Sequence, residues 1–99
     1  MPTLEEITVR LQKAVSEQPA PRTVTIDLKG EGFLHIEGST VSNANAPADC
    51  TVTVSMDDLV AMTKGELDPT TAFMTGRLKI AGDMSAAMAL QPILARAKA

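Results

Sequence analysis

The chain has 99 residues, of which 44% are hydrophobic and 21% charged, a size and balance that predict one folded domain over residues 1–99. Its net charge is −3 and it contains no run of Lys or Arg, so we expect neither a nucleic-acid partner nor docking on an anionic membrane. No apolar run approaches the roughly 20 residues of a membrane span, and the acidic N-terminal residues differ from a basic secretory signal. We therefore expect a cytoplasmic protein with no stable membrane insertion.

The first predicted element is an amphipathic helix that begins after Thr3. Thr3 and Glu6, three residues later, form a capping box. The segment 18–21 contains two prolines, which end the helix. Apolar side chains between these limits recur at helical spacing and form one stripe: Leu4, Ile7, Leu11, Ala14 and Val15.

Alternation of apolar and polar residues predicts the strands that follow. Two strands, 24–29 and 33–37, are joined at Gly30-Glu31-Gly32 as a hairpin. The pattern is weak over 41–46 and strong over 50–56. A fifth strand is predicted around Leu78 and Ile80.

Three further helices are marked by their ends. Ser55 and Asp58 form a capping box ahead of a helix that stops at Gly65. Asp68-Pro69 opens a short helix that ends at Gly76. Asp83 caps a final helix that runs from Met84 towards Arg96 and Lys98, kinked at Pro92.

The predicted order is therefore α-β-β-β-β-α-α-β-α, which places the chain in the α+β class. Strict alternation in every strand favours a mostly antiparallel five-stranded sheet with one face in solvent. The helices must then cover the other face.

The sequence offers little catalytic or metal-binding chemistry. Cys50 and His35 are its single cysteine and histidine, so neither an internal disulfide nor a four-ligand soft-metal site can form. We expect Cys50 to be buried and His35, which alternates with the apolar Leu34 and Ile36, to face solvent. No nucleophile elbow or phosphate-binding loop is present. We expect no enzyme activity, no metal and no cofactor.

The apolar inventory is unusual for a domain of this size. Phe33 and Phe73 are the only aromatic residues, whereas five of the six methionines lie in the second half of the chain. Methionine adapts to irregular surroundings, which fits a plastic ligand cavity. An ordinary core with methionine as a gap-filler is the interpretation that composition alone favours, and both interpretations stay open at this point.

The segment 56–83 closely resembles the sterol carrier protein 2 family, the nonspecific lipid-transfer proteins. The resemblance lies in the spacing of its motifs: Lys64-Gly65, Asp68-Pro69, Ala72-Phe73-Met74, Gly76-Arg77-Leu78-Lys79-Ile80 and Gly82-Asp83. It implies that an acyl chain or sterol lies in an apolar tunnel between the sheet and the helices. The matching positions are Leu34, Ile36, Met56, Leu59, Val60, Met62, Phe73, Met74, Leu78, Ile80, Met84 and Met88. Gln91 is a candidate polar contact for a headgroup, as are Lys64, Arg77 and Arg96.

The resemblance leads us to expect noncovalent binding and carriage of a lipid or long-chain amphiphile, such as a fatty acid, an acyl-CoA or a sterol-like molecule, without catalysis. A transient membrane or enzyme partner would fit this function. The alternative is a protein-interaction or dimerisation accessory domain whose core is fully packed.

Overall fold

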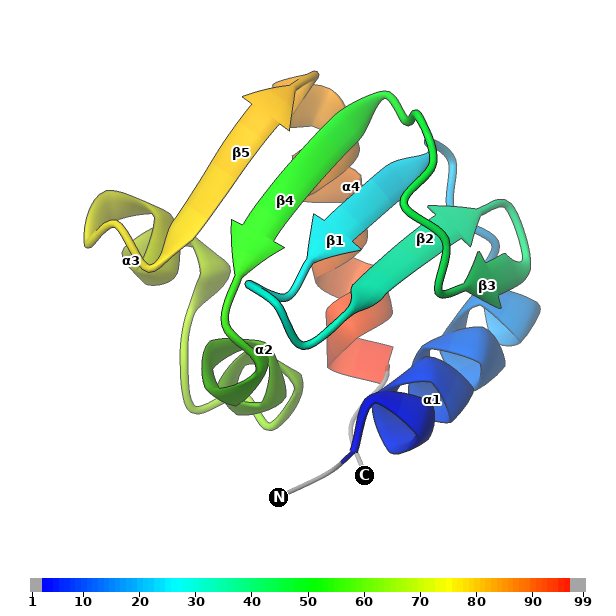
Figure 1. Cartoon of the computed structure of the whole chain (residues 1–99), viewed down its shortest axis with the longest axis horizontal. Coiled ribbons are helices and arrows are strands. Elements are labelled where there is room, and N and C mark those ends of the chain that lie inside the picture. Colours follow the sequence, from blue (N-terminus) through cyan, green and yellow to red (C-terminus); the bar gives the residue numbers. More distant parts are fainter. Residues whose placement is uncertain (1–2, 97–99) are drawn as a thin grey trace.

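The computed structural model describes residues 3–96, except for the side chain of Ala95, and has the predicted element order (Figure 1). The elements in chain order are α1 (Leu4–Glu17), β1 (Val24–Asp27), β2 (Phe33–Glu37), β3 (Thr40–Ser42), β4 (Cys50–Val54), α2 (Met56–Thr63), α3 (Pro69–Met74), β5 (Leu78–Gly82) and α4 (Met84–Arg96). Lys98, which we expected in the last helix, lies outside the described residues. None of the helices in the described part is long and apolar enough to cross a membrane.

The five strands form one sheet in the order β3-β2-β1-β4-β5. Three of the four neighbouring pairs are antiparallel, which confirms a mostly antiparallel sheet. The central pair β1 and β4 is parallel, with Val24 opposite Cys50, so the sheet is mixed. Alternation along a strand reports which of its faces is buried and carries no information on the direction of the neighbouring strand.

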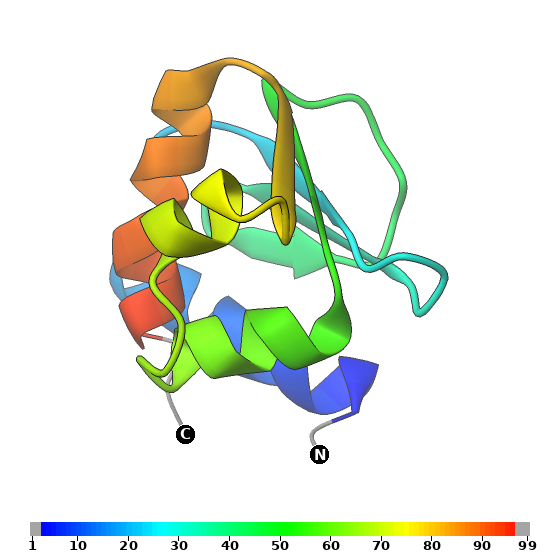
Figure 2. The ribbon, with the colours of Figure 1, turned by 90° about the vertical axis from the view of Figure 1, so that its left-hand side faces the viewer.

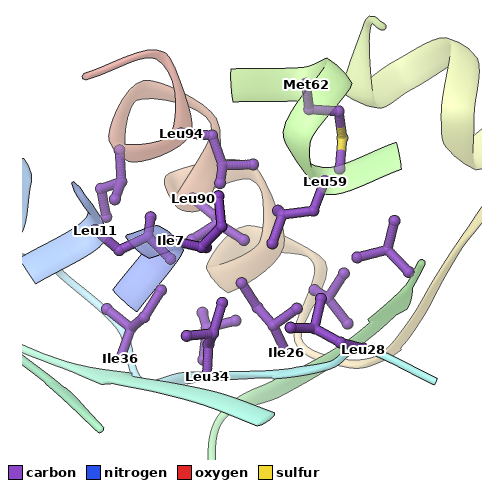
Figure 3. Packing of buried hydrophobic residues seen from close by; sticks show 14 of the residues in the cluster. Ile7, Leu11, Ile26, Leu28, Leu34, Ile36, Leu59, Met62, Leu90 and Leu94 are labelled. Carbon is purple, nitrogen blue, oxygen red and sulfur yellow. The ribbon is translucent and has the colours of Figure 1, made fainter. Parts of the chain in front are cut away.

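The helices lie together on one face of the sheet, as expected (Figure 2). Side chains of β1 and β2 point into this layer and meet those of α1, α2 and α4 (Figure 3). Ile26, Leu34 and Leu11 are completely buried there. This packed core accounts for most of the large apolar side chains, because each strand and helix buries one apolar face against the other layer.

Local signals fixed the helix ends as predicted. The side-chain oxygens of Thr3 and Ser55 accept the backbone N–H of the residue three positions on, and Asp68 accepts that of Thr70. Two predictions had overlapped at Met56, which we assigned both to a strand and to the approach of a helix. Ser55 is the N-cap, so β4 ends at Val54 and Met56 is the first residue of α2.

The outer face of the sheet is only partly in solvent, and the prediction for His35 was wrong. The segment that joins β3 to β4 crosses this face (Figure 1). The hydroxyl of Thr25 donates to the carbonyl oxygen of Ala46 in that segment at 2.8 Å. Beside it, His35 Nδ1 lies 2.9 Å from Thr25 Oγ1. His35 does point away from Leu34 and Ile36, but the crossing segment leaves it only 9% exposed.

Candidate ligand-binding cleft

An apolar cleft of about 260 Å³ lies between the edge of the sheet, α3 and α4. Its lining residues come from β4, β5, α3 and α4, and two of them, Thr70 and Gln91, have polar side chains. Among the described residues that line it, none is ionisable. The lining consists of Val52, Pro69, Thr70, Phe73, Leu78, Ile80, Met84, Ala87, Met88, Leu90, Gln91 and Leu94.

The periodicities of the elements explain how these side chains meet. On α4, the lining residues Met84, Ala87 and Met88 recur at the spacing of one helical face. On β5, Leu78 and Ile80 alternate onto one side of the strand, and Val52 of β4 stands opposite Ile80. A helix face and a strand face thus form two apolar walls.

The cleft is open to solvent at its outer rim. Phe73 is 45% exposed, Met84 47% and Met88 65%. In contrast, Leu90 and Leu94 are buried at the base. The enclosed apolar cavity that we expected is therefore not shown, and the structure presents an open cleft with flexible side chains around its mouth.

The structure separates the thirteen predicted binding residues into groups. Those in the cleft are Phe73, Leu78, Ile80, Met84, Met88 and Gln91. Those buried in the packed core without lining the cleft are Leu34, Ile36, Leu59, Val60, Met56 and Met62. Met74 is 80% exposed and does not line the cleft, so the structure does not bring it together with the other predicted residues.

Sequence reasoning missed the other half of the lining. Ala87 lies three residues after Met84, and Leu94 lies three residues after Gln91, so helical spacing could have identified both. No comparable signal identifies Val52, because its place opposite Ile80 depends on the pairing of β4 with β5. The remaining missed residues are Pro69, Thr70 and Leu90.

The three cations considered as headgroup contacts do not line the cleft. Arg96 instead joins α4 to the end of α1: its Nε donates to Gln18 Oε1 at 2.7 Å, and its guanidinium lies 3.8 Å from the carboxylate of Glu17. Lys64 and Arg77 are exposed outside the cleft. Of the four candidate headgroup contacts, only Gln91 lines the cleft.

The potentially reactive side chains of the described residues form no metal site, and the single cysteine packs in the core. Within residues 3–96, no group of three His, Cys, Asp or Glu residues is placed to hold a metal ion. Cys50 is buried as predicted, and its burial, with a further contribution from the charge of Asp83, raises the pKa of its thiol. Cys50 is therefore a protonated core residue at neutral pH, with little of the thiolate that reacts as a nucleophile.

Together these observations describe an α+β domain with an apolar cleft at the boundary between its sheet and its helices. The sequence profile of the SCP-2 sterol transfer family matches residues 1–95, and the chain belongs to this family.

Individual relatives agree with this assignment. Sterol carrier protein 2 from Bos taurus is 47% identical over 55 residues, which are 56% of this chain and 10% of that protein. The chain thus matches only about a tenth of the length of this curated relative. Two solved structures from Aedes aegypti share the fold. Sterol carrier protein 2 like 2 has a TM-score of 0.77 at 22% identity and covers 89% of this chain and 93% of its own. Sterol carrier protein 2 in complex with palmitate has a TM-score of 0.76 at 14% identity and covers 93% and 94%.

Proposed function

We propose that this protein binds the apolar chain of a lipid or long-chain amphiphile noncovalently in the cleft and carries it without chemical turnover. The observation that carries the proposal is the cleft itself, whose two walls are apolar and whose rim leaves Phe73, Met84 and Met88 partly in water. A ligand chain lying between the walls would remove both surfaces from water.

The size of this effect makes chain length a measure of binding in the cleft. Each methylene group moved from water into an apolar environment contributes about 0.8 kcal/mol, which is roughly a fourfold gain in affinity. Affinity should rise with each added methylene until the cleft is full and then level off. Methionine suits such a site, because its flexible side chain adapts to chains of different shape.

The palmitate complex of the related Aedes aegypti protein supports an acyl chain as the ligand. Binding without turnover is supported by the lining, whose described residues include no ionisable group to act as a nucleophile, acid or base. A membrane or an enzyme that contacts the protein transiently is the natural source and destination of such a ligand, and we include this transient partner in the proposal.

Two tryptophan variants test the position of the ligand. The chain has no tryptophan, so Met88→Trp at the cleft and Met74→Trp outside it each introduce one fluorescent reporter. Both methionines are exposed on a helix, which makes the pair closely matched. On titration with fatty acids and monoglycerides of increasing chain length, we expect a blue shift from Met88→Trp and none from Met74→Trp.

Two results would contradict the proposal. One is the absence of a spectral change in either variant together with no binding by isothermal calorimetry of the unmodified protein. The other is an equal change in both variants, which would place the ligand on the general surface rather than in the cleft.

A further inference from the structure

A second hollow of about 350 Å³ adjoins the apolar cleft. It lies between the end of α2, the connection to α3, and α4, and it shares Pro69, Gln91 and Leu94 with the cleft. Its other lining residues are Met62, Gly65, Leu67 and Asp68. The cleft and the second hollow therefore adjoin each other and share part of their walls.

The second hollow differs from the cleft in its polar groups. Asp68 is the one ionisable side chain among the described residues that line it, and no cation lines either hollow. Asp68 Oδ1 accepts the backbone N–H of Thr70 at 2.8 Å and so holds the start of α3. A group that enters the hollow therefore meets one acidic residue and no basic residue among the described lining.

The backbone around the hollow offers few free donors. The N–H of Gly65 donates to the carbonyl oxygen of Met62, and those of Glu66 and Leu67 both donate to that of Ala61. An anionic headgroup would find a carboxylate and no free N–H from this turn. A hydroxyl headgroup could donate to Asp68 and could exchange hydrogen bonds with the amide of Gln91, which both donates and accepts.

We propose that the second hollow is a headgroup subsite, an inference that rests on the proposed function. The subsite selects amphiphiles with an uncharged, hydroxyl-bearing headgroup over anionic ones. The apolar cleft holds the chain, Gln91 lies at the junction, and Asp68 discriminates against a negative charge. The ligand class this defines is that of the monoacylglycerols and other single-chain lipid alcohols, in preference to free fatty acids.

The test compares three amphiphiles of equal chain length by isothermal calorimetry: a monoacylglycerol, the corresponding fatty acid and the corresponding alkyltrimethylammonium. For the unmodified protein we expect the monoacylglycerol to bind about two- to fivefold more tightly than the fatty acid, since Asp68 is exposed and an exposed charge contributes modestly. Asp68→Asn should strengthen fatty-acid binding and so lower the ratio of monoacylglycerol affinity to fatty-acid affinity. The variant keeps the helix start intact, because asparagine caps a helix as well as aspartate does.

Asp27→Asn is the matched control. Asp27 Oδ1 also accepts a backbone N–H two residues on, that of Lys29 at 2.9 Å, and Asp27 lines neither hollow. Its substitution should leave the ratio unchanged. Gln91→Leu should weaken the monoacylglycerol alone.

The possible failures are distinguishable. Equal affinities for monoacylglycerol and fatty acid, or a ratio that Asp27→Asn changes as much as Asp68→Asn, would overturn the subsite while leaving chain binding in the cleft intact. Tightest binding of the alkylammonium would overturn the choice of an uncharged headgroup. Binding of none of the three would overturn the subsite together with the proposed function.

Discussion

The threonine at position 25 joins three parts of the chain on the outer face of the sheet. Its single hydroxyl proton goes to the carbonyl oxygen of Ala46, so the Nδ1–H of His35 donates to the same hydroxyl oxygen. Thr25 is 1% exposed and His35 9%. These hydrogen bonds satisfy polar groups that the crossing segment shields from water, and they hold that segment against β1.

We expect Thr25→Val to destabilise the protein by about 1–3 kcal/mol, because it leaves the Ala46 carbonyl and the imidazole without their partner while keeping the side-chain shape. The free energy of unfolding from urea denaturation measures this. Thr51→Val, on the neighbouring strand β4, is the control, because Thr51 is only half-buried and should tolerate the change within about 0.5 kcal/mol. An equal decrease in the free energy of unfolding of the two variants would show that the hydrogen bonds of Thr25 do not contribute to stability.

His35 also shows why burial of single residues is only partly predictable. Alternation correctly placed Leu34 and Ile36 on the core side, with the imidazole on the other side. Whether that other side meets water depends on the path of residues 43–49, whose sequence carries no periodic pattern that would reveal it. A polar residue facing outward was therefore mistaken for an exposed one.

At the scale of elements, local chemistry determined most boundaries. N-caps before α1, α2 and α3, and glycines with positive φ after α2 and α3, lie where the sequence placed them. These signals involve residues a few positions apart, so they can be recognised without knowing the fold. The parallel pairing of β1 with β4 could not be recognised in this way, because the hairpin β2–β3 separates these strands in the chain.

The last helix, α4, is anchored in the core near its end but contains a proline. Ile93 and Leu94 are buried against the core, and Arg96 contacts the end of α1. Pro92 lies inside α4, where its ring removes one backbone hydrogen bond and crowds the preceding turn. The turn that carries Gln91 therefore lacks one of the backbone hydrogen bonds of a regular helix.

We expect backbone amides after Gln91 to exchange with deuterium faster than those of β1 and β4. Hydrogen exchange reports local opening of the backbone. The backbone hydrogen bond that Pro92 cannot make lowers the free energy needed to open this turn. Pro92→Ala restores an N–H donor and should slow exchange in this turn by at least tenfold, which corresponds to about 1.4 kcal/mol, while leaving the strands unchanged. Mass-spectrometric exchange on the intact protein measures both regions. Protection after Gln91 equal to that of the strands before any substitution would contradict a weakened turn.

The candidate site belongs to the scale of the whole molecule, which is why the sequence predicted it incompletely. Phe73, Met84 and Met88 were identified by their family-like motif and their composition. Leu34 and Ile36 were included because they face inward, yet they lie beneath α1 and α4 in the packed core (Figure 3). An inward-facing side chain can either pack against a helix or line a cleft, and only the placement of α3 and α4 over the sheet decides between the two.

The open rim links ligand binding to overall stability. Water reaches Phe73, Met84 and Met88 in the free protein, and a bound chain would cover these side chains only in the folded state. Ligand at one hundred times its dissociation constant stabilises the fold by about 2.7 kcal/mol, which for a chain of this length raises the melting temperature by roughly 10 °C. We expect a rise of this size when delipidated protein is melted with a saturating monoacylglycerol or fatty acid, and little change with a short-chain analogue at the same concentration.

A variant that occupies the cleft should abolish this rise. Ala87 lines the cleft on α4, and Ala87→Phe fills part of the space between the two walls. Its melting temperature should respond to the ligand by less than about a quarter of the normal shift, since a chain excluded from the cleft no longer binds preferentially to the folded state. Ala81→Phe is the control, because Ala81 is exposed on β5 away from the cleft and should keep the full response. If the ligand stabilises neither the unmodified protein nor the control, the exposed side chains of α3 and α4 serve contact with another protein, and the domain acts as an accessory rather than a carrier.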